Sequence, residues 1–109
     1  MKKWIAGTVL TGVALLGASP AFALSAWSPS AKAYAETFSR DTAVSLTIKT
    51  SQKAHTDYYR ETDPSDPYHL WNKGAKGSTT TSGYGGKITQ LRACNWIPDN
   101  DDECSRYYR

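Results

Sequence analysis

Residues 42–49 read TAVSLTIK, and this stretch decides the fold because apolar and polar side chains alternate along it. Val44, Leu46 and Ile48 share one face of an extended chain, and the serine, threonine and lysine that follow them share the other. A period of two residues is typical of a β-strand with one buried face. We therefore predict a strand here whose apolar face contributes to the core.

The segments that follow predict further short strands joined by turns. Ala54, Thr56 and Tyr58 continue the inward-facing pattern on a partner strand, after a turn near residues 51–52. Residues 61–67 contain two prolines, two aspartates and a serine, and this composition indicates a loop. Two more strands and two glycine-containing turns are expected in the order strand 68–72, turn 73–77, strand 78–82 and turn 83–86.

The last strand predicted lies at residues 87–94 and carries an irregularity. Ile88 and Leu91 both compete for the inner face, but their spacing of three breaks the alternation and predicts a β-bulge. Several short strands with Gly and Pro turns between them indicate an all-β fold. We expect a small antiparallel sandwich or barrel-like domain over residues 42–109.

Residues 1–23 have the three parts of a cleavable signal peptide. Lys2 and Lys3 are followed by an uncharged, mostly apolar run at 4–17, and Ala21-Phe22-Ala23 gives the small-x-small pattern of a cleavage site. The alternative is a retained membrane anchor, but the apolar run is shorter than the about 20 residues of a membrane span. We predict a secreted, extracellular protein with no membrane contact after cleavage.

Residues 24–41 leave two alternatives open. Ser28 followed by Pro29 fits the start of a helix, and Tyr34 and Phe38 lie four residues apart, as on one helical face. The run is short and rich in serine and threonine, so an extended N-terminal arm fits equally well. The prediction for this segment is a short helix or an arm.

Cys94 and Cys104 are the two cysteines of the chain, and they follow an export signal. A disulfide between them is therefore expected, and closing this short loop contributes about 2–3 kcal/mol by the loop-entropy model. Two cysteines without a paired histidine motif do not predict a zinc site.

The charge of the chain argues against nucleic acid as a partner. The chain has 13 lysines and arginines against 10 acidic residues, but Lys2 and Lys3 lie in the export signal, which leaves 11 against 10. A protein that binds nucleic acid non-specifically would need a clear basic excess.

The C-terminal part resembles a known group of proteins. Asn72-Lys73-Gly74 and Gly77-Ser78-Thr79 lead into a strand ending in Leu91-Arg92-x-Cys94, and Asp102-x-Cys104-Ser105 closes the domain. This order is similar to that of small secreted proteins of actinobacteria (Streptomyces-type), most of them uncharacterised. The resemblance implies a secreted β domain closed by a disulfide and implies no activity.

The residues that could carry catalysis are few. A small secreted nuclease would need a base and an acid that titrate near neutral pH, with an arginine to hold phosphate. Glu61, either His55 or His69, and either Arg60 or Arg92 are of the right types. Nothing in their spacing forces them together, so we interpret both histidines as residues of half-exposed strands and predict no catalytic site and no cofactor.

Two other groups of residues could bind a ligand. Asp99, Asp101 and Glu103 begin like a calcium loop, but no glycine follows at the sixth position, and a solvated acidic loop is the simpler interpretation. Aromatic residues with nearby arginines could form an interface or a sugar platform, or could instead cover the open end of the β domain. The aromatic set consists of Trp96, Tyr107 and Tyr108, with Arg106 beside it.

From these features we expect a secreted, non-enzymatic interaction module that binds a protein partner or a cell-surface glycan such as that of the cell wall. The alternative is an antimicrobial or toxin-like protein that acts on competing microbes. A small secreted hydrolase is a third hypothesis.

Overall fold

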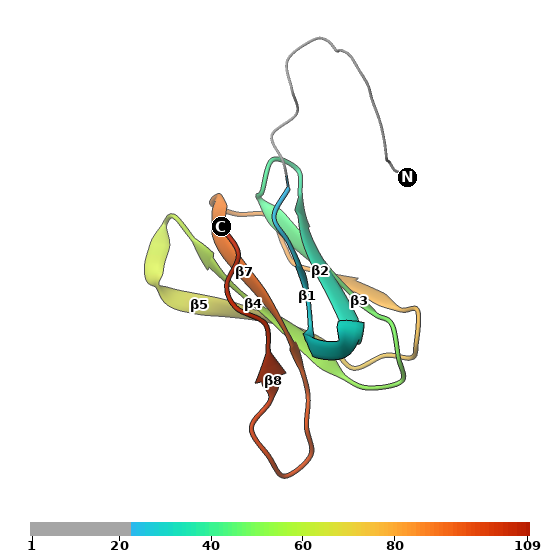
Figure 1. Cartoon of the computed structure of the whole chain (residues 1–109). Helices are drawn as coiled ribbons and strands as arrows, with labels where there is room; N and C mark the ends of the chain where they lie inside the picture. Colours follow the sequence, from blue (N-terminus) through green and yellow to red (C-terminus); the bar gives the residue numbers. More distant parts are fainter. Residues whose placement is uncertain (1–22) are drawn as a thin grey trace, which may run out of the picture.

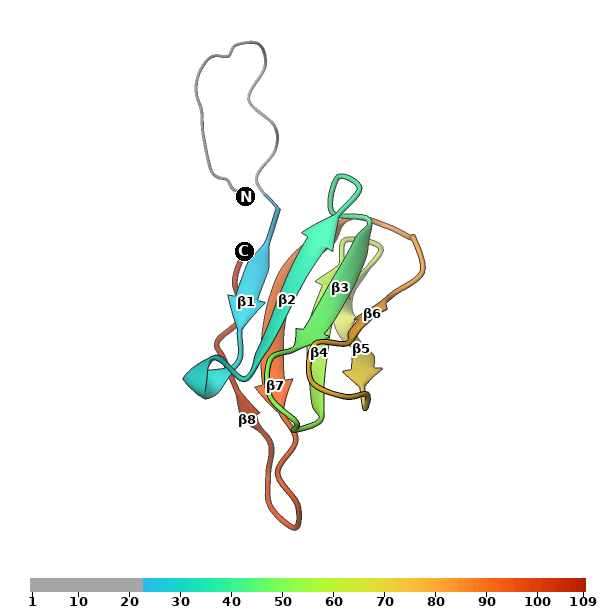
Figure 2. The ribbon, with the colours of Figure 1, turned by 90° about the vertical axis from the view of Figure 1, so that its right-hand side faces the viewer.

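Two four-stranded antiparallel sheets face each other across one core in the computed structural model, which describes residues 23–109 (Figures 1 and 2). This confirms the predicted all-β fold. The predicted signal peptide lies, except for Ala23, outside the described residues. The first sheet has the order β1 (Ser25–Trp27), β2 (Ala33–Phe38), β3 (Ala43–Ile48) and β6 (Thr79–Thr81). The second sheet has the order β5 (Asp63–Asn72), β4 (Ala54–Arg60), β7 (Ile88–Asn95) and β8 (Glu103–Cys104).

The core lies between the two sheets and follows the predicted alternation. Val44, Leu46 and Ile48 of β3 are completely buried, as the period of two residues predicted. The second sheet meets them with three large side chains, and alanines from both sheets fill the remaining space. The other members of the core are Ala26, Ala33, Ala35, Ala54, Tyr58, Ile88, Leu91 and Ala93.

The predicted inward face of β4 is confirmed, but its predicted pairing with β3 is wrong. Ala54, Thr56 and Tyr58 are buried. However, β4 pairs with β5 and β7, whereas β3 pairs with β2 and β6. The connection near residues 51–52 therefore crosses from one sheet to the other, because both strands bury their apolar faces in the same core.

Residues 24–41 form neither a helix of two or three turns nor an arm. They form β1, the short 3-10 turn η1 (Pro29–Ala31) and β2, so the domain begins before residue 42. Ala33 and Ala35 are fully buried and pair with Ile48 and Leu46 of β3. Pairing with a strong strand overrides the helical preference of alanine, which is only a weak determinant of structure.

The segment 61–67, predicted as a loop, belongs mostly to a strand. Only its first two residues turn the chain, and β5 starts at Asp63. β5 is an edge strand, and its register against β4 shifts between Tyr58 and Arg60. Pro64 and Pro67 are tolerated there because an edge strand has one side that needs no backbone donor.

The predicted irregularity in the last long strand is confirmed. Tyr59 pairs with Gln90 and Arg60 pairs with Ile88, so Thr89 is the additional residue of a bulge. This bulge allows both Ile88 and Leu91 to reach the core.

The disulfide between Cys94 and Cys104 is also confirmed, and it joins two residues that are directly paired between β7 and β8. It fixes the C-terminal segment beside the sheet, where Tyr108 forms a further bridge to Leu91. Among the described residues, no helix has the length and apolar character needed to cross a membrane.

Arg60 is buried without an acidic partner and holds the loop between β6 and β7. Its guanidinium donates hydrogen bonds to the carbonyl oxygens of Thr42 (2.8 Å), Gly86 (2.7 Å) and Gly83 (3.1 Å). The guanidinium lies so close to Gly85 that a Cβ at that position would come within 2.9 Å of it. Arg60 is therefore a structural residue.

Replacing Arg60 with leucine should lower the free energy of unfolding by about 2–4 kcal/mol, because three carbonyl groups would lose a charged donor. Urea denaturation followed by fluorescence measures this loss. The exposed Arg109 provides the control, since Arg109→Leu should change stability by less than about 0.5 kcal/mol. Equal effects of the two substitutions would contradict the structural role of Arg60.

Candidate functional site

The outer face of the second sheet, which points away from the core, carries a compact group of charged residues. Directly paired residues of neighbouring strands point to the same side of a sheet. Asp57 of β4 pairs with His69 of β5 and with Arg92 of β7. One row further along, His55 lies between Trp71 and Cys94. We call these residues, together with Asp102, the Asp57 cluster; its members are His55, Asp57, His69, Arg92 and Asp102.

Asp57 is the centre of this cluster and is only 1% exposed. Its Oδ1 accepts hydrogen bonds from Nδ1 of His55 and Nδ1 of His69, both at 2.7 Å. Its Oδ2 accepts from Nε and a terminal nitrogen of Arg92, both at 2.8 Å. Burial alone would raise the pKa of Asp57, but these hydrogen bonds and the charge of His55 outweigh burial and hold the pKa far below its usual range.

His55 is held between two carboxylates. Its Nδ1 donates to Asp57, and its Nε2 donates to Oδ2 of Asp102 at 2.8 Å. Ionised carboxylates only accept hydrogen bonds, so both ring nitrogens must carry protons and His55 is an imidazolium. Burial alone would lower the pKa of His55, but the hydrogen bonds and charges of the two aspartates outweigh burial and raise it.

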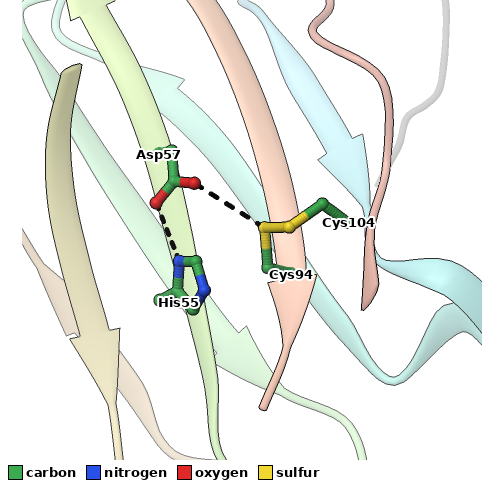
Figure 3. Close-up of side chains that lie close together, drawn as sticks. All are labelled: His55, Asp57, Cys94 and Cys104. Carbon is green, nitrogen blue, oxygen red and sulfur yellow. Dashed lines mark hydrogen bonds and ion pairs between the residues drawn. A yellow bond between two sulfur atoms is a disulfide. The ribbon is translucent and has the colours of Figure 1, made fainter. Parts of the chain in front are cut away.

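The cluster lies directly against the disulfide, as Figure 3 shows for His55, Asp57, Cys94 and Cys104. The Cys94 sulfur lies 3.7 Å from Oδ2 of Asp57. A disulfide sulfur carries no proton, so this approach is a contact and not a hydrogen bond.

The same four residues are of types that bind metal ions, and the one ligand atom that each could offer lies within 4.8 Å of the others. Two of these atoms are joined in the disulfide. Cysteine binds a metal ion as a thiolate, so in the disulfide-bonded protein only His55 and Asp57 of this group offer ligand atoms.

His69 and Arg92 are the most exposed members of the cluster. The His69 side chain is 54% exposed, and its Nδ1 is fixed by Asp57. The Arg92 guanidinium lies 4.7 Å from the centre of the Tyr107 ring, and that ring packs against Tyr59. Burial raises the pKa of Tyr107 to about 12, so this phenol stays protonated over the physiological range.

The residues whose chemical types would suit catalysis are brought together only in part. His55, His69 and Arg92 meet in the Asp57 cluster, although their spacing did not predict it. Glu61 lies in an exposed turn and Arg60 holds a backbone loop, so neither belongs to the cluster.

Asp57 and Asp102 were not predicted as site residues. The sequence contains one signal for Asp57, because a residue two positions after His55 on a strand lies on the same face. Asp102 has no such signal, since its approach to His55 depends on how the disulfide loop folds.

The aromatic residues proposed as a binding surface do not form one patch. Trp96 lies under Lys53, with the ammonium 4.9 Å from the ring centre. Tyr107 lies on the outer face, whereas Tyr108 packs partly against the core. Arg106 is exposed and stacks over Tyr108. Tyr108 thus fits the interpretation that these aromatics cover the open side of the domain.

The acidic residues considered for weak calcium binding are not grouped around one point either. Asp99 and Asp101 are exposed, and Glu103 lies on β8 with one carboxylate oxygen 3.4 Å from the Asn95 amide. Within residues 23–109, the one group of potential metal ligands that converges is the group beside the disulfide described above.

Comparisons of the chain with models of protein families, with curated proteins and with solved structures gave no match. The resemblance to small secreted actinobacterial proteins therefore stays a prediction.

The charge on His55 should make stability depend on pH. The folded-state pKa is raised above the ordinary value of 6.5, so the contribution of His55 is complete below that value and is lost as the pH rises through the folded pKa. We expect the free energy of unfolding to fall as the pH rises above about 6.5, and a series of measurements from pH 6 to pH 9 follows this loss. Urea denaturation across this range measures it.

The control for this prediction is a pair of histidine variants. His55→Gln should lose most of the pH dependence, and His69→Gln should keep it, because only His55 is held by two carboxylates. A wild-type stability that is flat from pH 6 to pH 9 would contradict the assignment, as would an unchanged slope in His55→Gln.

Proposed function

We propose that this protein is a secreted, non-enzymatic binding module whose target is a protein partner or a cell-surface glycan. The observation that supports this best is the exposed layer over the Asp57 cluster. We call this layer the outer-face patch, and it consists of His69, Trp71, Arg92 and Tyr107.

The composition of the outer-face patch fits binding. Trp71 is 39% exposed on the edge strand β5, and its ring contacts His55 at 4.5 Å between ring centres. Tryptophan, tyrosine and arginine are the residues that most often dominate the energy of protein interfaces. Trp71, Arg92 and Tyr107 each pack against a fixed neighbour, so little side-chain entropy remains to be lost on binding.

The cluster beneath the patch fits a structural role better than a catalytic one. Both nitrogens of His55 and both oxygens of Asp57 are used in hydrogen bonds within the protein. A catalytic acid or base needs a proton position that faces the substrate. His55 and Asp57 instead hold neighbouring strands in place.

Secretion is supported by two features. The signal-like residues 1–23 give an export route, and the disulfide is of the kind that persists in an oxidising compartment.

A small hydrolase is a second candidate, because one observation favours it. His69 has its Nδ1 fixed by a carboxylate while more than half of its side chain reaches solvent, close to Arg92. A carboxylate that orients a histidine in this way is a common element of general-base catalysis. Incubation with RNA and with phosphodiester substrates tests it, and cleavage that disappears in His69→Ala would establish it.

The binding proposal is tested by affinity capture with the full chain expressed for export and tagged at its C-terminus. The variant His69→Ala/Tyr107→Ala should bind the captured protein or glycan at least about tenfold more weakly, the scale of a hot-spot loss. Tyr84→Ala is the matched control, because Tyr84 is 73% exposed and lies in the loop between β6 and β7, away from the patch.

Capture of a stoichiometric target by the wild type and by Tyr84→Ala, with loss in the patch variant, supports the proposal. Equal capture by all three proteins contradicts the assignment of the patch. Inhibition of competing microbes by the purified protein, with no target captured, would replace the proposal with the antimicrobial function.

A further inference from the structure

One end of the sandwich collects lysines from separate parts of the chain. Lys32 precedes β2, Lys49 and Lys53 flank the connection from β3 to β4, and Lys73 and Lys76 lie in the connection from β5 to β6. Four of these five side chains are exposed, and Lys32 is partly exposed. We call this group the lysine end.

Backbone contacts show that these connections lie together. The amide of Lys49 bonds to the carbonyl of Lys32 at 2.9 Å, and the amide of Gly77 bonds to the carbonyl of Ile48 at 2.8 Å. Lys53 and Lys73 flank the paired residues Ala54 and Asn72. Both sheets therefore contribute to the lysine end, which lies at the bottom of the view in Figure 2.

All three tryptophans within residues 23–109 lie at this end, and each has a lysine over its ring. The distances from ammonium to ring centre are 5.9 Å for Lys49 and Trp27, 4.9 Å for Lys53 and Trp96, and 5.4 Å for Lys73 and Trp71. Trp27 is 48% exposed. Trp71 is also exposed, whereas Trp96 is partly buried, so two of the three cation–π pairs hold an ammonium next to exposed apolar surface.

The opposite end of the sandwich carries both acidic and basic residues. Asp41 and Glu61 lie in its turns and Asp63 and Asp66 at the start of β5, and Arg40, Arg60 and Lys87 are basic residues of the same end. The feature that distinguishes the lysine end is therefore not a separation of charge along the strands, but a group of solvent-accessible lysines, three of which lie over tryptophan rings.

Acidic residues reach the lysine end only through the disulfide loop. Asp102 is bound by His55, and Glu103 approaches the amide of Asn95. Asp99 and Asp101 are exposed in the part of the loop that extends beyond the other connections (Figure 2). These two aspartates would meet a flat anionic surface first and repel it, whereas a flexible chain can pass beside them.

We propose that the lysine end binds an anionic glycopolymer of the cell surface, in which phosphate groups alternate with sugar or polyol units. The ammonium groups would bind successive phosphates, and the exposed indole surface would contact the units between them. The lysines are distributed over three connections and do not converge on one point, which fits a chain better than a single small anion. This site is distinct from the outer-face patch, apart from the edge residue Trp71.

The test is a titration of the full exported chain with purified poly(glycerol phosphate) teichoic acid, followed by tryptophan fluorescence and by co-sedimentation. We expect saturable binding that weakens steeply as salt rises, because the contacts are between exposed charges. Neutral dextran should not bind.

The decisive variant is Lys49→Gln/Lys53→Gln/Lys76→Gln, which should weaken binding of the polymer at least about tenfold, since three charge contacts are lost. Lys87→Gln is the matched control and should bind within about twofold of the wild type, because Lys87 is an exposed lysine at the opposite end. Circular dichroism of each variant checks that the fold is retained.

Equal affinity of the triple variant and the wild type would overturn the inference, and so would tighter binding to phosphatidylglycerol vesicles than to the polymer. Its failure can be separated from failure of the proposed function. A protein partner that is captured through the outer-face patch while the polymer does not bind refutes the lysine end alone. Binding of the polymer that depends on these lysines, with patch variants unaffected in every capture, refutes the patch alone.

Discussion

The buried carboxylate of Asp57 is the constraint on which the second sheet depends. β4 is buried on both faces, and the charge of Asp57 lies on the face that has no hydrophobic sheet to cover it. An ionised carboxylate in such a place is tolerated only when donors surround it. The donors come from β4 itself, from β5 and from β7, so satisfying one charge joins three strands. Removal of one donor from a buried ion pair typically costs about 3–5 kcal/mol, which is a large part of the stability of a domain this small.

The modest size of the hydrophobic core explains why these polar contacts matter. The first sheet contributes several alanines, which bury little apolar surface each. A domain of this length removes only about 60% of its unfolded surface from water, so further links are needed. The Asp57 cluster, the disulfide and the Arg60 contacts supply them at three different places on the second sheet.

The sequence predicted local features well and long-range pairings poorly. The alternation around Leu46, the bulge near Thr89 and the disulfide are each visible in a short stretch, and the structure confirms them. The strand at Ala33–Phe38 was missed because alanine favours a helix in isolation, and its strand state arises only from pairing with β3. β5 was missed in part because its prolines indicate a loop unless the strand is known to be an edge. The Asp57 cluster depends on the register of β4 against both β5 and β7, which no local pattern determines.

The cluster also connects the two proposed binding surfaces physically. His55 bonds to Asp57 on one side and to Asp102 on the other, and Asp102 belongs to the acidic loop that borders the lysine end. The second oxygen of Asp102 accepts a hydrogen bond from the amide of Ile97 at 3.1 Å, so this one side chain braces its own loop as well. The proton on His55 therefore holds the acidic loop close to the sheet. Loss of that proton would leave Asp102 with one fewer donor and with its negative charge uncompensated beside the lysine end, which would oppose the binding of an anionic chain.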